Sequence, residues 1–174
     1  MLFGAAILLM VVASVNGQSL KVGYADANYI LSLLPESKQA QTNIASHEKM
    51  LQTQLEAKYK DYQTKLAAYQ QNASGFDEII RKDKETELMA LQQSIQQFEG
   101  DAQNSIVKKQ SELLQPIFKK IGEAIEAVAV ENNYDFIFSA GAQGVDVLLY
   151  AKESHDVTLI VLKKLGVDPP AETK

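Results

Sequence analysis

Few residues in this chain have the type and spacing that enzyme chemistry requires. The two histidines, His47 and His155, lie far apart in the sequence and do not form the H-E-x-x-H pattern of a zinc hydrolase. The chain also lacks the G-x-S-x-G pattern of a serine nucleophile and the G-x-x-x-x-G-K-S/T pattern of a phosphate-binding loop. It has no cysteine, which excludes thiolate metal sites and disulfides. We therefore predict that the protein is not an enzyme and has no catalytic residue, cofactor or metal site.

Three other motifs have structural interpretations. Residues 141–144 (GAQG) are typical of a hairpin turn, and the charged run 81–87 (RKDKETE) is typical of a solvated, salt-bridged surface. Residues 72–74 (NAS) form a glycosylation sequon, but a helix end explains the same residues.

The composition indicates a single modest domain that does not bind nucleic acid. The chain has 174 residues, of which 46% are hydrophobic, so it can build a core. Its formal net charge is −5 and its pI is about 5.1, whereas nucleic-acid binding needs a basic surface.

The first residues resemble an export signal. Residues 2–13 (LFGAAILLMVVA) form an apolar run that is too short to span a bilayer comfortably. Val15 and Gly17 are small enough for signal peptidase, which predicts cleavage after Gly17, although no Lys or Arg precedes the run. The alternative is a buried N-terminal helix. We expect an exported, periplasmic protein.

Residues 36–131 consist mostly of strong helix formers and contain one proline. Spacings of three, four and seven place apolar residues on one face of each half, which predicts two long helices that pack against each other. Ser74 and Asp77 have the spacing of a capping box, so we expect the chain to turn back there. Pro116 should kink the returning helix. Each limb would have about 35 residues and reach on the order of 50 Å.

This hairpin is predicted to form a solvent-exposed arm over residues 45–114. Its apolar and tyrosine residues are candidates either for the seam between the limbs or for contact with an unfolded protein. They are Leu51, Leu55, Tyr59, Tyr62, Leu66, Tyr69, Leu88, Leu91, Ile95 and Phe98.

The remaining segments, 18–44 and 115–168, predict a small α+β body, followed by a tail over 169–174. Three short strands are expected, over 20–25, 134–139 and 145–150. Asp26 should cap a short helix that ends at Leu33, and Asp156 should cap a last helix over 157–165. The long excursion between the first two strands favours a parallel pair, and the short turn favours a hairpin between the last two.

A body with so few strands is marginally stable alone and has unpaired strand edges. We therefore expect self-association into a closed homo-oligomer. The candidate assembly residues are Val22, Tyr24, Tyr134, Phe136, Phe138, Val147 and Leu149.

The order of these parts resembles the Skp/OmpH family of periplasmic chaperones over essentially all of the chain after residue 17. The similarity is carried by residues 21–26 (KVGYAD), Leu34-Pro35-Glu36, the long hairpin, Pro116-Ile117, Ile125-x-x-Val128-Ala129, 134–138 (YDFIF) and Asp156-Val157-Thr158.

The resemblance implies a "jellyfish" homotrimer, in which three bodies form a barrel-like hub and three arms enclose a cavity. It implies a holdase that binds unfolded outer-membrane β-barrel proteins without ATP and prevents their aggregation. It leaves open a contact with the membrane surface or with the outer-membrane assembly machinery. The acidic pI departs from the basic pattern of many members and argues against a lipopolysaccharide site. The alternative hypothesis is a coiled-coil adaptor or spacer of the cell envelope with one dedicated partner.

Overall fold

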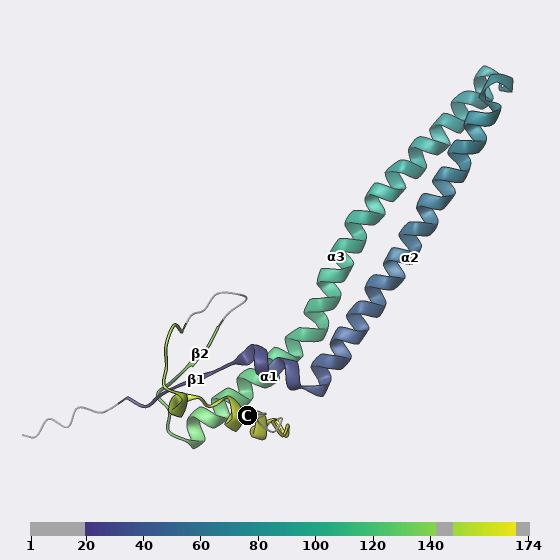
Figure 1. Cartoon of the computed structure of the whole chain (residues 1–174). Helices are drawn as coiled ribbons and strands as arrows, with labels where there is room; N and C mark the ends of the chain where they lie inside the picture. The colour runs from purple at the N-terminus through teal and green to yellow at the C-terminus, as the bar shows by residue number, and fades with distance from the viewer. Residues whose placement is uncertain (1–19, 142–147, 170–174) are drawn as a thin grey trace, which may run out of the picture.

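The computed structural model describes residues 20–141 and 148–169, and Figure 1 shows a small body from which a long helical arm projects. The arm consists of α2 (Pro35–Asn72) and α3 (Glu78–Glu131), which run antiparallel and are joined at the tip by a short 3-10 turn, η1 (Ala73–Gly75). The expected long helical hairpin is therefore confirmed. The predicted signal segment over 1–17 lies outside the described residues.

The body contains a two-stranded parallel sheet. Its strands are β1 (Val22–Ala25) and β2 (Phe136–Ser139), and Val22 lies opposite Phe136 in the register. The whole arm separates these strands in sequence, and such a crossover allows them to run in the same direction. The predicted parallel pairing is confirmed.

The expected third strand over 145–150 is not observed in its described part. Leu148, Leu149 and Tyr150 are outside any strand, while residues 142–147, including most of the expected turn, lie outside the described residues. The other edge of β1 is occupied instead by the segment that leads into the last helix. Asp156 forms a parallel bridge with Tyr24, and the Val157 N–H donates to the Tyr24 carbonyl at 2.9 Å. The segment before the last helix is thus joined to the edge of β1 that does not face β2.

An aspartate lies just before each of the two short body helices, and one of these aspartates caps its helix. The Asp26 carboxylate accepts hydrogen bonds from the backbone N–H groups of Asn28 and Tyr29, at 3.0 and 2.9 Å, and caps α1 (Ala27–Leu33) as predicted. The Asp156 carboxylate accepts from the Thr158 N–H at 2.8 Å, but the N-cap of α4 (Thr158–Lys164) is Val157, which makes no side-chain cap bond, so the expected Asp156 cap is displaced by one residue. Between β2 and α4 lies a second 3-10 turn, η2 (Glu153–His155).

The tip of the arm has one cap where the sequence suggested a reciprocal pair. Asp77 is the N-cap of α3, and its carboxylate accepts from the Ile80 N–H at 2.8 Å. Ser74 lies inside the η1 turn, so the helix begins three residues later than a Ser74 cap would require.

The core lies in the body, where α1, both arm helices and α4 meet (Figure 1). Leu34, at the junction of α1 and α2, is completely buried, as are Val161 and Leu162 on α4. The full cluster contains Ala25, Ile30, Leu34, Ala40, Ile117, Ile121, Ala124, Val128, Val157, Val161 and Leu162. The base of the arm is thus fixed to the body by apolar packing.

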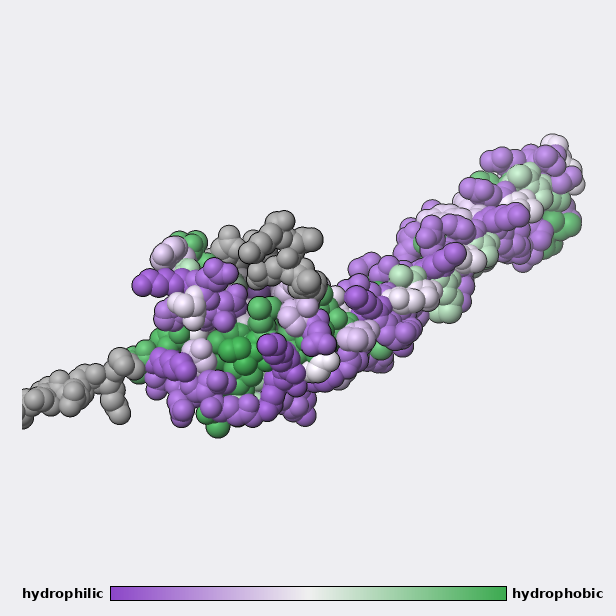
Figure 2. Space-filling model, turned by 60° about the horizontal axis from the view of Figure 1, so that its bottom comes forward, coloured by the Kyte–Doolittle hydropathy of each residue, from purple (hydrophilic) through white to green (hydrophobic). Residues whose placement is uncertain are grey.

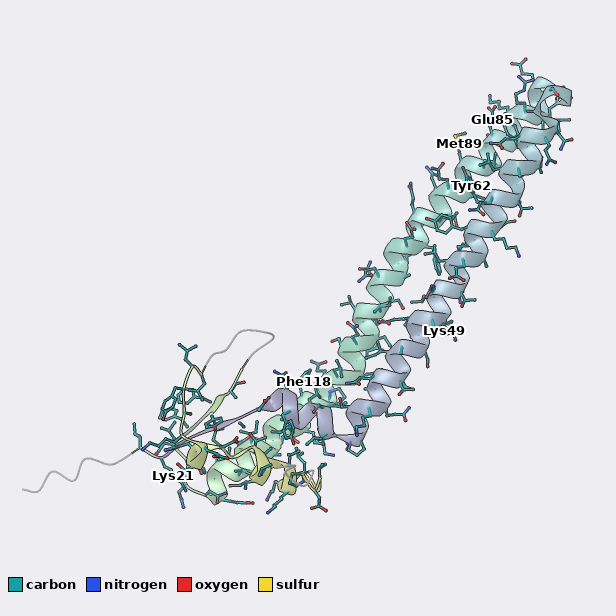
Figure 3. The ribbon with its side chains drawn as sticks, viewed as in Figure 1. Lys21, Lys49, Tyr62, Glu85, Met89 and Phe118 are labelled. Atoms are coloured by element: carbon teal, nitrogen blue, oxygen red, sulfur yellow. The ribbon has the colours of Figure 1, made fainter. Side chains whose placement is uncertain are left out.

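Pro116 lies inside α3, which remains one helix on both sides of it. Figure 1 shows that α3 changes direction where the arm meets the body, and Figure 3 labels Phe118 in this region. Proline removes a backbone donor and clashes with the preceding turn, so it weakens the helix locally. A kink caused by Pro116 stays a prediction.

Candidate functional site

The residues that could have supported catalysis hold the structure together instead. His47 Nε2 lies 2.8 Å from Ser105 Oγ, so this pair links the two arm helices. His155 Nδ1 lies 2.8 Å from the Val22 carbonyl oxygen in the body, at the other end of the molecule from the tip. Within residues 20–141 and 148–169, no group of three or more His, Asp or Glu residues could hold a metal ion. The candidate functional surfaces are therefore the arm and the exposed side of the body.

The arm has a thin apolar seam. Among the ten candidate residues, Ile95 is buried with 4% exposure, whereas Tyr59 is 41% exposed. Figure 3 shows Tyr62 pointing into the space between α2 and α3. The half-buried candidates are Leu51, Leu55, Tyr62, Leu66, Tyr69, Leu88, Leu91 and Phe98. Two helices alone cannot enclose these side chains, so part of each remains accessible to another molecule.

Polar bonds across the seam supplement this packing. The Tyr69 hydroxyl donates to Glu85 at 2.6 Å, and the Tyr59 hydroxyl donates to Glu99 at 2.7 Å. Lys58 Nζ donates to Ser94 Oγ at 3.2 Å. Closer to the tip, the Lys65 ammonium pairs with Glu87 across the seam.

Four groups in these bonds have shifted pKa values: Tyr59, Lys65, Tyr69 and Glu87. The hydrogen bond to Glu85 raises the pKa of Tyr69, and the bond to Glu99 raises the pKa of Tyr59. The bonds that Glu87 accepts from Lys65 and Lys84 lower its pKa, and the bond to Glu87 raises the pKa of Lys65. The distal arm is therefore held by exposed polar contacts that respond to pH and salt.

Sequence reasoning predicted the two stripes but missed these cross-limb pairs. His47 and Ser105 lie the same number of residues on either side of Phe76, as do Lys65 and Glu87. Equal distance from the turn was the signal that could have identified these two pairs, because residues at equal distances from the turn lie side by side on antiparallel helices of equal rise.

The base and the tip of the arm each contain a shallow hollow. At the base, Lys120 bonds to Glu36, which lowers the pKa of Glu36, beside a hollow of about 400 Å³ that Pro116 also lines. At the tip, Phe76 packs against Tyr69 with ring centroids 6.2 Å apart, beside a hollow of about 280 Å³. The carboxylate in each hollow is paired with lysine: Glu36 with Lys120 at the base, and Glu87 with Lys65 and Lys84 at the tip.

The body exposes apolar side chains around β2. Phe136 and Phe138 stack with centroids 6.2 Å apart and are 52% and 49% exposed. Leu149 is 91% exposed and Tyr150 is 82% exposed. Figure 2 shows a hydrophobic patch on one face of the body, whereas the arm is mostly hydrophilic with small hydrophobic spots.

The other assembly candidates are less accessible. Val22 and Tyr24 are half-buried, and Tyr134 packs against the core with the Lys21 ammonium 4.2 Å from its ring centroid. Val147 lies outside the described residues.

Among the described residues, every helix is too short or too polar to cross a membrane.

Comparisons with known proteins agree with this architecture. The chain is similar to the solved structure of a proposed outer membrane chaperone (OmpH-like) from Caulobacter crescentus CB15, with a TM-score of 0.72 and 12% sequence identity over 86% of each chain. No curated protein matches the chain. The family model OmpH, described as outer membrane protein (OmpH-like), matches residues 21–165. A hairpin arm inserted into a small two-stranded body, together with this match, shows that the chain belongs to the OmpH-like family.

Proposed function

We propose that the protein is an ATP-independent holdase chaperone that binds unfolded outer-membrane β-barrel proteins in the periplasm. The observation that carries this proposal is the arm, whose two long helices project far from the core and leave most of their seam residues half-exposed (Figure 3). A holdase must bind many sequences, which requires dispersed and non-directional contacts rather than one shaped pocket. Weak contacts spread along an arm suit this role.

Self-association through the body is part of the proposal. Stacked Phe136 and Phe138, together with Leu149 and Tyr150, are large apolar side chains exposed in the body, and a group of exposed apolar side chains is typical of an interaction surface. A homotrimer with a shared hub would cover these side chains and place three arms around a cavity. Several weak contacts presented by three arms would then act together on one unfolded chain.

The proposed location follows from the sequence and from family membership. Removal of residues 1–17 after Gly17 would leave an exported protein, and the periplasm has no ATP supply. Binding and release would therefore depend on the free energy of the contacts alone. Family membership supports outer-membrane proteins as clients, meaning the unfolded proteins that the chaperone holds.

The proposal is tested by diluting a urea-unfolded outer-membrane β-barrel protein into buffer without nucleotide and recording light scattering. The purified protein should suppress the scattering at a molar ratio near one trimer per client. Unchanged aggregation at a several-fold excess would contradict the proposal. An envelope adaptor would instead bind one dedicated partner and leave scattering unchanged for unrelated β-barrel proteins.

A further inference from the structure

One face of α3 carries no charge over most of the arm. The face lies opposite the seam, and its residues follow spacings of three, four and seven, which place them on one side of a helix. All of them are exposed. We call this the uncharged face, and it consists of Met89, Gln93, Gln96, Gly100, Gln103, Val107, Ser111 and Phe118.

The remaining surface of the arm is different. The flanks of α3 carry Glu99, Asp101 and Lys108 over the same length. The corresponding outer side of α2 carries charged residues, and Figure 3 shows one of them, Lys49, pointing away from α3. An outer helix face in water is usually rich in Lys and Glu, because charges favour hydration and suppress association. The absence of charge is therefore specific to one side of one limb.

Gly100 lies in the middle of this face, and no contact within the chain explains why this residue is a glycine. A Cβ placed on it would meet nothing within 4 Å, so packing does not require a glycine. Glycine is also a poor residue for a helix interior, where alanine would be more favourable. Glycine allows another backbone to approach a helix closely, which gives it a use if a second chain lies on this face.

The side chains on the face suit an unfolded polypeptide of low charge. Glutamine has both donor and acceptor groups, so Gln93, Gln96 and Gln103 can bond to the N–H and C=O groups of an extended backbone. Met89 and Val107, which are 59% and 55% exposed, and Phe118 offer separate apolar contacts along the helix. The lack of cations gives no attraction to nucleic acid or to anionic lipid.

We infer that the uncharged face of α3 is the surface on which an unfolded, weakly charged polypeptide lies along the arm. This inference rests on the proposed function and adds a second contact surface to the half-exposed seam residues. From Met89 to Phe118 the face extends about 43 Å at 1.5 Å per residue. In Figure 1, α3 is the limb on the sheet side of the arm, so the face lies on the same side as the body's sheet.

Charge substitutions test the inference. The probe is a fluorescent, urea-unfolded outer-membrane β-barrel protein, and its Kd is measured by anisotropy after dilution. The double variant Gln93→Lys/Gln96→Lys and its counterpart Gln93→Glu/Gln96→Glu should both bind at least about fivefold more weakly, because bound polypeptide would bury the new charges. The matched control, Gln63→Lys/Gln70→Lys, places the same charges on exposed positions of α2 and should change Kd by less than about twofold.

Other outcomes would overturn the inference. Wild-type affinity in both α3 variants, tighter binding by the lysine variant, or equal weakening by the α2 control would each contradict it. If the wild-type protein itself does not bind the probe, the proposed function fails, and this result is distinguishable from failure of the surface assignment. Helical circular dichroism of each variant verifies that the arm remains folded.

Fluorescent labels provide a readout without added charge. The chain has no cysteine, so Gln96→Cys and Gln63→Cys can each carry a single environment-sensitive dye. The label at position 96 should shift to the blue when the unfolded probe is added, and the label at 63 should not. A shift at 96 that depends on protein concentration without the probe would show that a second copy covers the face, which would overturn the inference.

Discussion

The Tyr69 hydroxyl donates a 2.6 Å hydrogen bond to Glu85 across the seam, which joins the last turns of α2 to the first turns of α3. The Tyr59–Glu99 bond at 2.7 Å repeats this relationship farther from the tip. Because the apolar seam is thin, these polar bonds contribute a larger share of the stability of the arm than they would in a globular core.

The arm should lose stability as the pH rises above about 10. Both tyrosines have a pKa above the ordinary value of 10.0, so the folded state holds the phenolic proton more tightly than the unfolded state. The resulting stabilisation is complete below pH 10 and is lost as the pH rises through the raised values. Urea unfolding followed by helical circular dichroism at a series of pH values measures this loss.

The variant Tyr59→Phe/Tyr69→Phe should be less stable at neutral pH and should depend less on alkaline pH. The Lys65 ammonium, whose pKa is also raised, would retain part of the dependence. Tyr62→Phe leaves both tyrosine–glutamate bonds in place and is the control. An unchanged alkaline profile in the double variant would contradict this account of the seam.

Ser37→Ala should leave the protein equally stable or stabilise it by up to about 1 kcal/mol. Ser37 lies in the first turn of α2 with 0% exposure, and its Oγ has no hydrogen-bond partner among the described residues. Alanine removes an unpaired buried hydroxyl and is the better helix former. Chemical denaturation of the variant measures the change in the free energy of unfolding.

Thr158→Ala is the matched comparison and should destabilise the body by about 1–3 kcal/mol. Thr158 is also buried, but its Oγ1 accepts a hydrogen bond from the Asp26 N–H at 2.9 Å. Removal of the Thr158 hydroxyl leaves the Asp26 N–H, which lies between β1 and α1, without this hydrogen bond. Equal effects of the two substitutions would show that buried hydrogen bonding does not decide stability here.

Gly23→Ala should destabilise the sheet by about 1–3 kcal/mol through overpacking. A Cβ at this position would lie 3.0 Å from Cε1 of Tyr134, 3.2 Å from Cγ1 of Val157 and 3.3 Å from the His155 carbonyl oxygen. The carbonyl belongs to the backbone beside β1 and cannot rotate away. Gly75→Ala, where a Cβ would meet nothing within 4 Å, is the control and should unfold like the wild type.

The variant Phe136→Asp/Phe138→Asp should shift the protein from oligomer to monomer. Both rings are half-exposed on β2, so in a single chain the substitution removes little packing. In an assembled hub it would bury unpaired charges. Sedimentation velocity measures the mass. A wild-type protein that is already monomeric, or a variant that keeps its oligomeric mass, would contradict the proposed assembly surface.

The long helices could be predicted from the sequence because their periodic apolar stripes extend over many turns, which makes the helix signal strong. The Asp26 cap could be predicted from the residue type before the helix, and the parallel pairing of β1 and β2 from the long crossover between them. The strand expected over 145–150 was not observed in its described part, because cross-strand neighbours stabilise a short strand more than its own residue types do. The cross-limb bonds depend on the register that the tip sets, which residue types alone do not determine.

The central claim is that the body assembles and the arm holds the unfolded protein. Deletion of residues 45–111 separates these roles, and sedimentation velocity with a labelled, unfolded outer-membrane β-barrel protein measures both at once. The shortened protein should sediment with the mass of a trimer, and the label should not move with it, whereas the intact protein should carry the label. A shortened protein that is monomeric, or one that still carries the label, would contradict the account.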